Sequence, residues 1–169
     1  MKNIIYVFAL IIFCASTSFA QTAPVAVAKT TKVAEREKFD PTRVAADDLK
    51  AAVAKAAKEN KRIILDVGGE WCSWCRLMDN YFAKNVELTK LREDNFVWLK
   101  VNFSPENENK EFLASYPEVK GYPHLFVLEK DGELLHSQDT SALEEGKGYN
   151  LKIFTEFLQK WSPAKSEDK

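Results

Sequence analysis

The chain has 169 residues, which suits a single domain at the usual size of about 100 to 200 residues per domain. Hydrophobic residues make up 46% and charged residues 29% of the sequence, a globular composition that argues against a fibrous or disordered protein. The 24 lysines and arginines balance the 25 aspartates and glutamates, so no positive excess indicates nucleic acid or an anionic membrane surface as a partner.

The amino terminus has the pattern of an export signal. Lys2 supplies a positive start, residues 4–13 form an apolar run, and small residues mark a cleavage point after Ala20. We therefore predict a signal peptide over residues 1–20 and an exported protein, with a bacterial periplasm as the expected compartment. The apolar run is shorter than the about 20 residues of a membrane span. A membrane tether, through an uncleaved anchor or a lipid on Cys14, is the less favoured alternative.

The next segment, residues 21–45, is rich in Ala, Thr, Val and Lys without a clear period, which predicts a flexible leader that does not pack. Asp47 or Asp48 then provides a cap for a helix that runs toward Asn60. Branched apolar residues over 62–67, followed by two glycines, predict a buried strand.

The rest of the chain alternates helical and extended patterns. Helices are predicted over 76–84, 86–91, 106–116 and 151–161, a strand over 96–103, and a hairpin from 125–128 and 134–136. Residues 141–150 are interpreted as a solvated loop, with the alternative that they shape one side of a site, and residues 162–169 as a polar tail. The element order predicts an α/β fold, in which a parallel βαβ unit precedes an antiparallel pair.

Two cysteines remain once the signal is removed, and they lie close together in the segment Trp71-Cys72-Ser73-Trp74-Cys75. This segment falls where a strand ends and a helix begins, a position at which the helix dipole favours a thiolate. Cys72 is therefore predicted to be the nucleophile. Cys75 follows one helical turn later and is placed to resolve a mixed disulfide, as thiol-disulfide exchange requires.

Further features accompany the cysteines. Asp66 stands six residues before Cys72 in an apolar strand, Lys100 lies in the next strand, and Gly121-Tyr122-Pro123 precedes an apolar run. With these residues the chain resembles the thioredoxin superfamily over about residues 48–161. The resemblance implies a thioredoxin-like domain over 46–161, with a central mixed sheet of about four to five strands and helices on both faces. It also implies a cis-proline loop in which Pro123 faces the cysteines.

The resemblance assigns roles to these residues, and each role has a physical basis. Burial raises the pKa of an aspartate, so Asp66 would relay a proton to or from Cys75, while Lys100 would oppose that shift. The alternatives are an Asp66 bonded to backbone groups without proton transfer, and a Lys100 that is an ordinary, partly exposed strand residue. His124 is expected at the surface or rim of the site, where it modulates the pKa of the thiol or, as the alternative, has no chemical role.

Substrate binding is expected around the motif. Tyr122 and Pro123 would present backbone to an extended substrate segment beside the disulfide, and Trp71 and Trp74 flank the cysteines as a recognition surface. The pair between the cysteines is Ser73-Trp74 and contains no histidine, so no imidazolium stabilises the thiolate of Cys72. This departure favours a reducing or isomerising couple. Within the superfamily, the chain resembles the soluble domain of membrane thiol-disulfide interchange reductases.

The predicted function is an exported thiol-disulfide oxidoreductase that reduces or isomerises protein disulfides. We expect protein disulfides as substrates, a membrane-linked thiol reductant as electron source, a monomer, and no cofactor or metal. A zinc site needs about four ligands, although Cys72, Cys75 and His124 remain an alternative set of three for copper or zinc. The second functional hypothesis is a non-catalytic binding module for a protein or metal, in which the cysteines form a stable disulfide.

Overall fold

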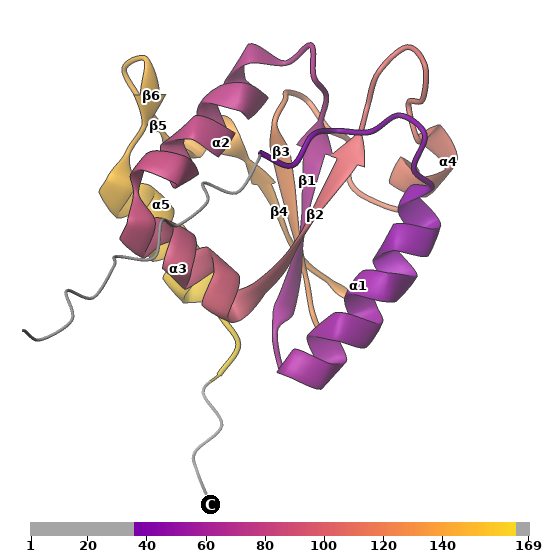
Figure 1. Ribbon diagram of the computed structural model, residues 1–169, viewed down its shortest axis with the longest axis horizontal. Coiled ribbons are helices and arrows are strands. Elements are labelled where there is room, and N and C mark those ends of the chain that lie inside the picture. The colour runs from indigo at the N-terminus through magenta and orange to yellow at the C-terminus, as the bar shows by residue number, and fades with distance from the viewer. Residues whose placement is uncertain (1–35, 165–169) are drawn as a thin grey trace, which may run out of the picture. The chain divides into compact units, whose positions relative to one another are not determined.

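The computed structural model describes residues 36–164 (Figure 1), so the predicted signal peptide and most of the leader lie outside the described residues. A four-stranded sheet in the order β2-β1-β3-β4 forms the centre of the domain. Its strands are β1 (Arg62–Gly68), β2 (Phe96–Asn102), β3 (His124–Leu128) and β4 (Leu134–Asp139). This number of strands confirms the predicted central sheet.

The sheet is mixed, as expected. β1 pairs with β2 in parallel, so that Asp66 lies opposite Lys100 in the register. β3 is antiparallel to both β1 and β4, and Asp66 lies opposite Leu125 on that side. Parallel neighbours require a crossover connection, and here the crossover contains the cysteine motif. The motif therefore lies just after the carboxyl end of β1, one of the two inner strands.

Helices cover both faces of the sheet, which confirms the predicted layers (Figure 1). Successive side chains of a strand point to opposite faces, so Ile63 and Leu65 of β1 pack with the first helix while Ile64 packs on the other face. No helix within residues 36–164 is long and apolar enough to cross a membrane. The helices are α1 (Ala45–Glu59), α2 (Ser73–Lys84), α3 (Val86–Asn95), α4 (Lys110–Leu113) and α5 (Leu151–Trp161).

The predicted aspartate cap of the first helix is wrong. The helix begins at Ala45 after Val44, whose side chain makes no capping hydrogen bond. Asp47 and Asp48 instead lie in the first turn, where negative charge is favoured by the helix dipole. Asp48 also accepts a hydrogen bond from Arg43 Nε at 2.8 Å, which ties the chain before the helix to its first turn.

The helix predicted over residues 106–116 is also wrong, because only Lys110–Leu113 is helical. Asn107 forms an isolated bridge with Ser104, and Asn109 adopts a left-handed conformation with φ 47°. The Asn109 side chain donates to the Asn102 carbonyl at 2.8 Å. Asparagine side chains that bond the backbone compete with helix formation, so the segment starts as a turn that closes on the end of β2.

The segment 141–150 is not the solvated loop that was expected. It contains part of a short helix, η1 (Thr140–Leu143), and a hairpin of β5 (Glu144–Glu145) and β6 (Gly148–Tyr149). Leu143 and Tyr149 are buried in the core beside α2 and α5. A segment that buries two large apolar side chains is fixed against the domain. Of the two interpretations of residues 141–150, the one that remains is that they shape one side of the site.

Packing also begins earlier than predicted at the amino-terminal side. The leader was expected not to pack over residues 21–45, but Phe39 is only 3% exposed and lies against the cysteines. The described part of the leader therefore belongs to the domain from Arg36 onward. At the other end α5 closes at Trp161, and residues 162–164 continue without regular structure.

Candidate active site

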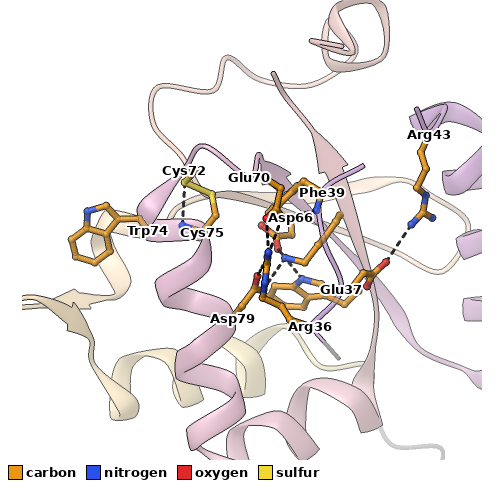
Figure 2. Close-up of polar contacts among 12 residues, drawn as sticks. Arg36, Glu37, Phe39, Arg43, Asp66, Glu70, Cys72, Trp74, Cys75 and Asp79 are labelled. Atoms are coloured by element: carbon orange, nitrogen blue, oxygen red, sulfur yellow. Dashed lines mark hydrogen bonds and ion pairs between the residues drawn. A yellow bond between two sulfur atoms is a disulfide. The ribbon is translucent and has the colours of Figure 1, made fainter. Parts of the chain in front are cut away.

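The two cysteines form a disulfide at the amino-terminal end of α2 (Figure 2). The helix begins at Ser73, three residues earlier than predicted, and Cys72 is its N-cap. The sulfur of Cys72 accepts a hydrogen bond from the Cys75 backbone N–H at 3.1 Å. When the disulfide is reduced, the same N–H and the helix dipole are placed to stabilise a thiolate on Cys72.

Both cysteines are largely covered by neighbouring side chains. Cys75 is fully buried, and Cys72 is 4% exposed. Phe39 from the amino-terminal segment packs against both, together with the half-buried side chains of Trp74 and Tyr122. An incoming sulfur atom can therefore reach the pair only at the small accessible part of Cys72.

Asp66 is completely buried, on the face of β1 on which Gly68, two residues later, meets Cys75. Its Oδ2 accepts hydrogen bonds from Lys100 Nζ at 3.0 Å and from Trp98 Nε1 at 3.1 Å. Its Oδ1 has no hydrogen-bond partner among residues 36–164. Burial raises the pKa of the Asp66 carboxyl, and the Lys100 charge opposes that shift only in part. The alternative of an aspartate bonded to backbone groups is wrong, because its partners are side chains.

Lys100 is 7% exposed, so its interpretation as a partly exposed strand residue is wrong. Its ammonium group also contacts Asp79 Oδ1 at 2.8 Å, which places it between two carboxylates. Burial alone would lower the pKa of Lys100, but the charges of Asp66 and Asp79 outweigh it and raise this pKa. Lys100 is therefore a cation in the protein interior that two acids share.

The sequence reasoning missed two residues of this cluster. Asp79 follows Cys75 by four residues on α2, so both face the same side of the helix, and its side chain is 10% exposed. That spacing from the cysteine was the available signal. Arg36, whose Nη1 lies 2.9 Å from Asp79 Oδ2, belongs to the segment taken for a leader, where no local pattern indicated packing.

The loop before β3 completes the front of the site. The Tyr122–Pro123 peptide bond is cis, and the Pro123 carbonyl accepts a hydrogen bond from Thr140 Oγ1 at 2.6 Å. The Tyr122 ring stacks on Phe103 with centroids 4.9 Å apart and meets the edge of Trp71 at 5.4 Å. The structure thus brings Trp71 and Tyr122 together beside Cys72.

Trp71 is the most exposed aromatic side chain next to the disulfide, at 54%. Its indole N–H is already used, because it donates to the Phe103 carbonyl at 2.6 Å. The exposed part of the ring therefore offers apolar and π contacts. Beside it lies a pocket of about 340 Å³ whose walls are Trp71, Phe103, Ser104, Pro105 and Glu108.

Trp74 lies on the other side of the cysteines and is half-buried. Its ring packs edge-on against Tyr149 of β6 with centroids 5.8 Å apart. A second pocket, of about 330 Å³, is formed by this side chain and its neighbours Ser73, Leu77, Gly146 and Lys147. The hairpin that replaces the expected loop thus builds one wall of the site.

His124 does not lie at the rim, since it is only 5% exposed. Its Nε2 lies 2.8 Å from Ser137 Oγ, and its ring packs on Phe126 in the core that α1 covers. Burial lowers the pKa of this imidazole. Between residues 36 and 164 no three His, Cys, Asp or Glu side chains are grouped so as to hold a metal ion. The alternative set of Cys72, Cys75 and His124 is therefore not assembled.

Comparison with known proteins places this geometry in a family. A family model described as thioredoxin-like matches residues 44–130. A human protein, spermatogenesis-associated protein 20, is 43% identical over 51 residues, which are 30% of this chain and 6% of that protein. The chain thus matches only a small part of that relative's length.

Solved structures agree on the fold. A disulphide isomerase from Xylella fastidiosa superposes with a TM-score of 0.62 at 24% identity, covering 72% of this chain and 94% of that one. The oxidised carboxy-terminal domain of DsbD from Neisseria meningitidis gives a TM-score of 0.50 at 25% identity, covering 74% of this chain and 99% of that one. Each similarity extends over most of the described domain.

Proposed function

The chain belongs to the thioredoxin-like family, and on that premise we propose that it is an exported thiol-disulfide oxidoreductase that reduces or isomerises protein disulfides. One observation carries the proposal: the Cys72–Cys75 disulfide lies at the amino-terminal end of α2, against the face of β1 that bears the buried carboxyl of Asp66. Side chains two residues apart on a strand share a face, so Asp66 lies on the side of β1 on which Gly68 meets Cys75. This arrangement joins a nucleophile, a resolving thiol and a proton acceptor.

The reaction begins with the reduced pair. The Cys72 thiolate attacks a client disulfide, and one client sulfur leaves as a thiolate while a mixed disulfide forms on Cys72. Cys75 then gives its proton to the Asp66 carboxylate, and its sulfur attacks Cys72. The second client sulfur leaves as a thiolate, and both client thiolates take up protons. Two electrons have passed from the cysteines to the client, and the Cys72–Cys75 disulfide remains.

The surface around Cys72 suits a polypeptide client. Trp71 and Tyr122 form an aromatic wall on one side, and Trp74 with the β5–β6 hairpin forms the other. An extended chain can lie between these walls against the backbone of Tyr122 and Pro123, the two residues that precede β3. A small accessible sulfur between aromatic walls favours a segment that presents its disulfide in an extended conformation.

Export and the electron source complete the proposal. The amino-terminal pattern of a positive start, an apolar run and small residues supports secretion into a periplasm. An oxidising compartment does not keep a dithiol reduced, so a membrane-linked thiol reductant would have to restore the pair after each cycle. The resemblance to a DsbD carboxy-terminal domain supports such an electron source.

The test is the reduction potential of the Cys72–Cys75 pair in the purified mature protein. The protein is equilibrated in graded thiol buffers, alkylated, and its free thiols are counted by mass. A potential near about −270 mV supports a reductase, whereas one near about −120 mV reverses the direction of electron flow. Absence of any reversible couple would refute the enzymatic function.

A second function is favoured by one observation, the 4% exposure of Cys72. A disulfide that is nearly buried would also suit a binding module in which the bond only stabilises the fold. In that case the aromatic walls would hold a partner without sulfur exchange. Dithiothreitol distinguishes the two, because a redox-active pair opens in the folded protein at millimolar thiol, and a structural one opens only on unfolding.

A further inference from the structure

A chain of alternating charges leads from the buried acid to the amino-terminal segment (Figure 2). Lys100 Nζ bonds Asp66 at 3.0 Å and Asp79 at 2.8 Å. Arg36 Nη1 in turn bonds the other oxygen of Asp79 at 2.9 Å. The last member is Glu70, which Arg36 also bonds, with its Nη1 3.1 Å from Glu70 Oε1. The network thus connects Asp66 to a residue two positions before Cys72.

Asp79 holds the central place in this network. Each of its carboxylate oxygens has a cationic partner, Lys100 on one and Arg36 on the other. Lys100 therefore divides its charge between two acids instead of neutralising Asp66 alone. Because the Lys100 side chain is 4% exposed and that of Asp66 is fully buried, water screens this contact little.

The segment that carries Arg36 is fastened over the same cluster. The Phe39 backbone N–H donates to Glu70 Oε1 at 2.9 Å, and the Phe39 ring lies 4.1 Å from Lys100 Nζ. The Cζ and Cε1 atoms of that ring lie 3.1 and 3.4 Å from where a Cβ on Gly68 would stand, a position that is also in contact with the Cys75 sulfur. Residues 36–39 consequently contact the acid cluster at Glu70, Asp79 and Lys100, and Arg36 is held between the carboxylates of Glu70 and Asp79.

We propose that Asp79 and Arg36 are positioning residues for proton transfer between Cys75 and Asp66: Asp79 draws the Lys100 ammonium partly away from Asp66, and Arg36 limits how strongly it does so. The inference rests on the proposed exchange reaction and adds to it a role for residues outside the cysteine motif. The proton concerned is the one that Cys75 loses when its sulfur attacks the mixed disulfide.

The surroundings of Asp66 support this role. Lys100 and the Trp98 N–H face it from β2, and Asp79 faces it from α2. The Tyr149 phenol faces it from β6. Burial is the main reason that the pKa of this phenol is raised, and the nearby Asp66 charge adds to that shift. The Asp79 charge adds to the effect of burial in raising the pKa of Asp66. Arg36 and Glu70 act one contact further out.

The two residues should therefore shift Asp66 in opposite directions. In Asp79→Asn the competing charge is gone and Lys100 turns to Asp66, so the carboxyl should titrate about one pH unit lower. In Arg36→Gln the Asp79 carboxylate loses its second cation and attracts Lys100 more strongly, so Asp66 should titrate at higher pH. The midpoints are read from the ¹³C carboxyl resonance of Asp66 in the full mature protein with its disulfide intact.

The kinetic readout is the resolving step itself. Reduced protein is mixed with an equimolar aromatic disulfide, Ellman's reagent, and the second release of thionitrobenzoate reports the attack of Cys75 on the mixed disulfide. Below both midpoints, Asp79→Asn should resolve faster than the parent protein, by up to about tenfold, since a shift of one pH unit changes the ionised fraction tenfold and the weaker base offsets part of that gain. Arg36→Gln should resolve more slowly over the same pH range.

Matched controls come from an exposed ion pair on α3. Lys90 bonds Asp94 at 2.7 Å and contacts neither the cluster nor the segment that carries Arg36, so Lys90→Gln and Asp94→Asn should change neither midpoint nor rate profile. If Asp79→Asn and Arg36→Gln shift Asp66 no more than these controls, or shift it in the same direction, the proposal is overturned. It is also overturned if the midpoints separate while the rate profiles do not follow. The carboxyl titration needs no turnover, so failure of the oxidoreductase function alone would leave the opposite shifts measurable.

Discussion

Gly68 lies so close to Cys75 that a Cβ on it would stand 2.5 Å from the Cys75 sulfur and 3.1 Å from the Phe39 ring. Such a distance is below any contact that carbon and sulfur tolerate, so the last residue of β1 has no room for a side chain. The close approach holds the resolving cysteine, the strand that carries Asp66 and the amino-terminal segment in one packed unit.

Gly68→Ala is therefore expected to destabilise the oxidised protein by about 1 to 3 kcal/mol, the usual cost of forcing an extra methyl group into a packed core. Urea unfolding followed by tryptophan fluorescence measures this change. Gly148→Ala is the matched control, because a Cβ there meets no atom within 4 Å. Equal stability of the two variants would contradict the contact between Gly68 and Cys75.

The buried acid should make stability depend on pH. Burial raises the pKa of Asp66 in the folded protein above its value in the unfolded chain, so the folded state binds the proton more tightly. The resulting stabilisation is complete below the unfolded pKa and is lost as the pH rises through the folded pKa. Asp66→Asn removes this dependence. As the pH is raised from 4 to 8, the free energy of unfolding of Asp66→Asn should therefore increase relative to that of the parent protein.

Unfolding curves across this pH range test the expectation. Asp94→Asn serves as the control, because Asp94 is exposed and its ion pair with Lys90 lies in water. A difference between Asp66→Asn and the parent that stays constant with pH would show that Asp66 does not change its proton affinity on folding.

The cysteines should have unequal roles in turnover. Cys72→Ser removes the nucleophile at the N-cap of α2 and should abolish reduction of a protein disulfide such as that of insulin. Cys75→Ser leaves the nucleophile but no resolving thiol, so mixed disulfides with clients should accumulate and be visible on non-reducing gels. Ser73→Ala, between the two, should retain activity. Full turnover by Cys72→Ser would disprove the mechanism.

Trp71 should contribute to client recognition and not to sulfur chemistry. Its exposed ring beside Tyr122 can stack on a polypeptide, so Trp71→Ala should lower kcat/KM for a protein disulfide by about five- to tenfold. Its reaction with dithiothreitol, which needs no such contact, should keep the parent rate. Val86→Ala, at a position that is 73% exposed on α3, is the control. Equal losses with the protein disulfide and with dithiothreitol would assign Trp71 a structural role instead.

The sequence alone was sufficient for the α/β fold class, for the central sheet and for the position of the cysteine motif. Apolar runs of strand length, the Asp131-Gly132 turn and the amphipathic pattern of residues 151–161 each depend on local periodicity, and each corresponds to an observed element. The position of Cys72 at a strand-to-helix junction likewise follows from neighbours in the chain. Local patterns are legible in a sequence because the side chains that produce them are adjacent.

Contacts between distant segments were decided only by the tertiary structure. Nothing local to Arg36 or Phe39 indicates that they pack beside residues 70 and 79, and the loop expected over 141–150 gains its structure by burying Tyr149 against Trp74. Asparagine side chains that bond the end of β2 likewise prevented the helix expected over 106–116. Burial and charge pairing depend on which surfaces meet when the chain folds. For that reason the sequence identified Asp66 and Lys100, and only the folded protein showed that Asp79 and Arg36 complete their network.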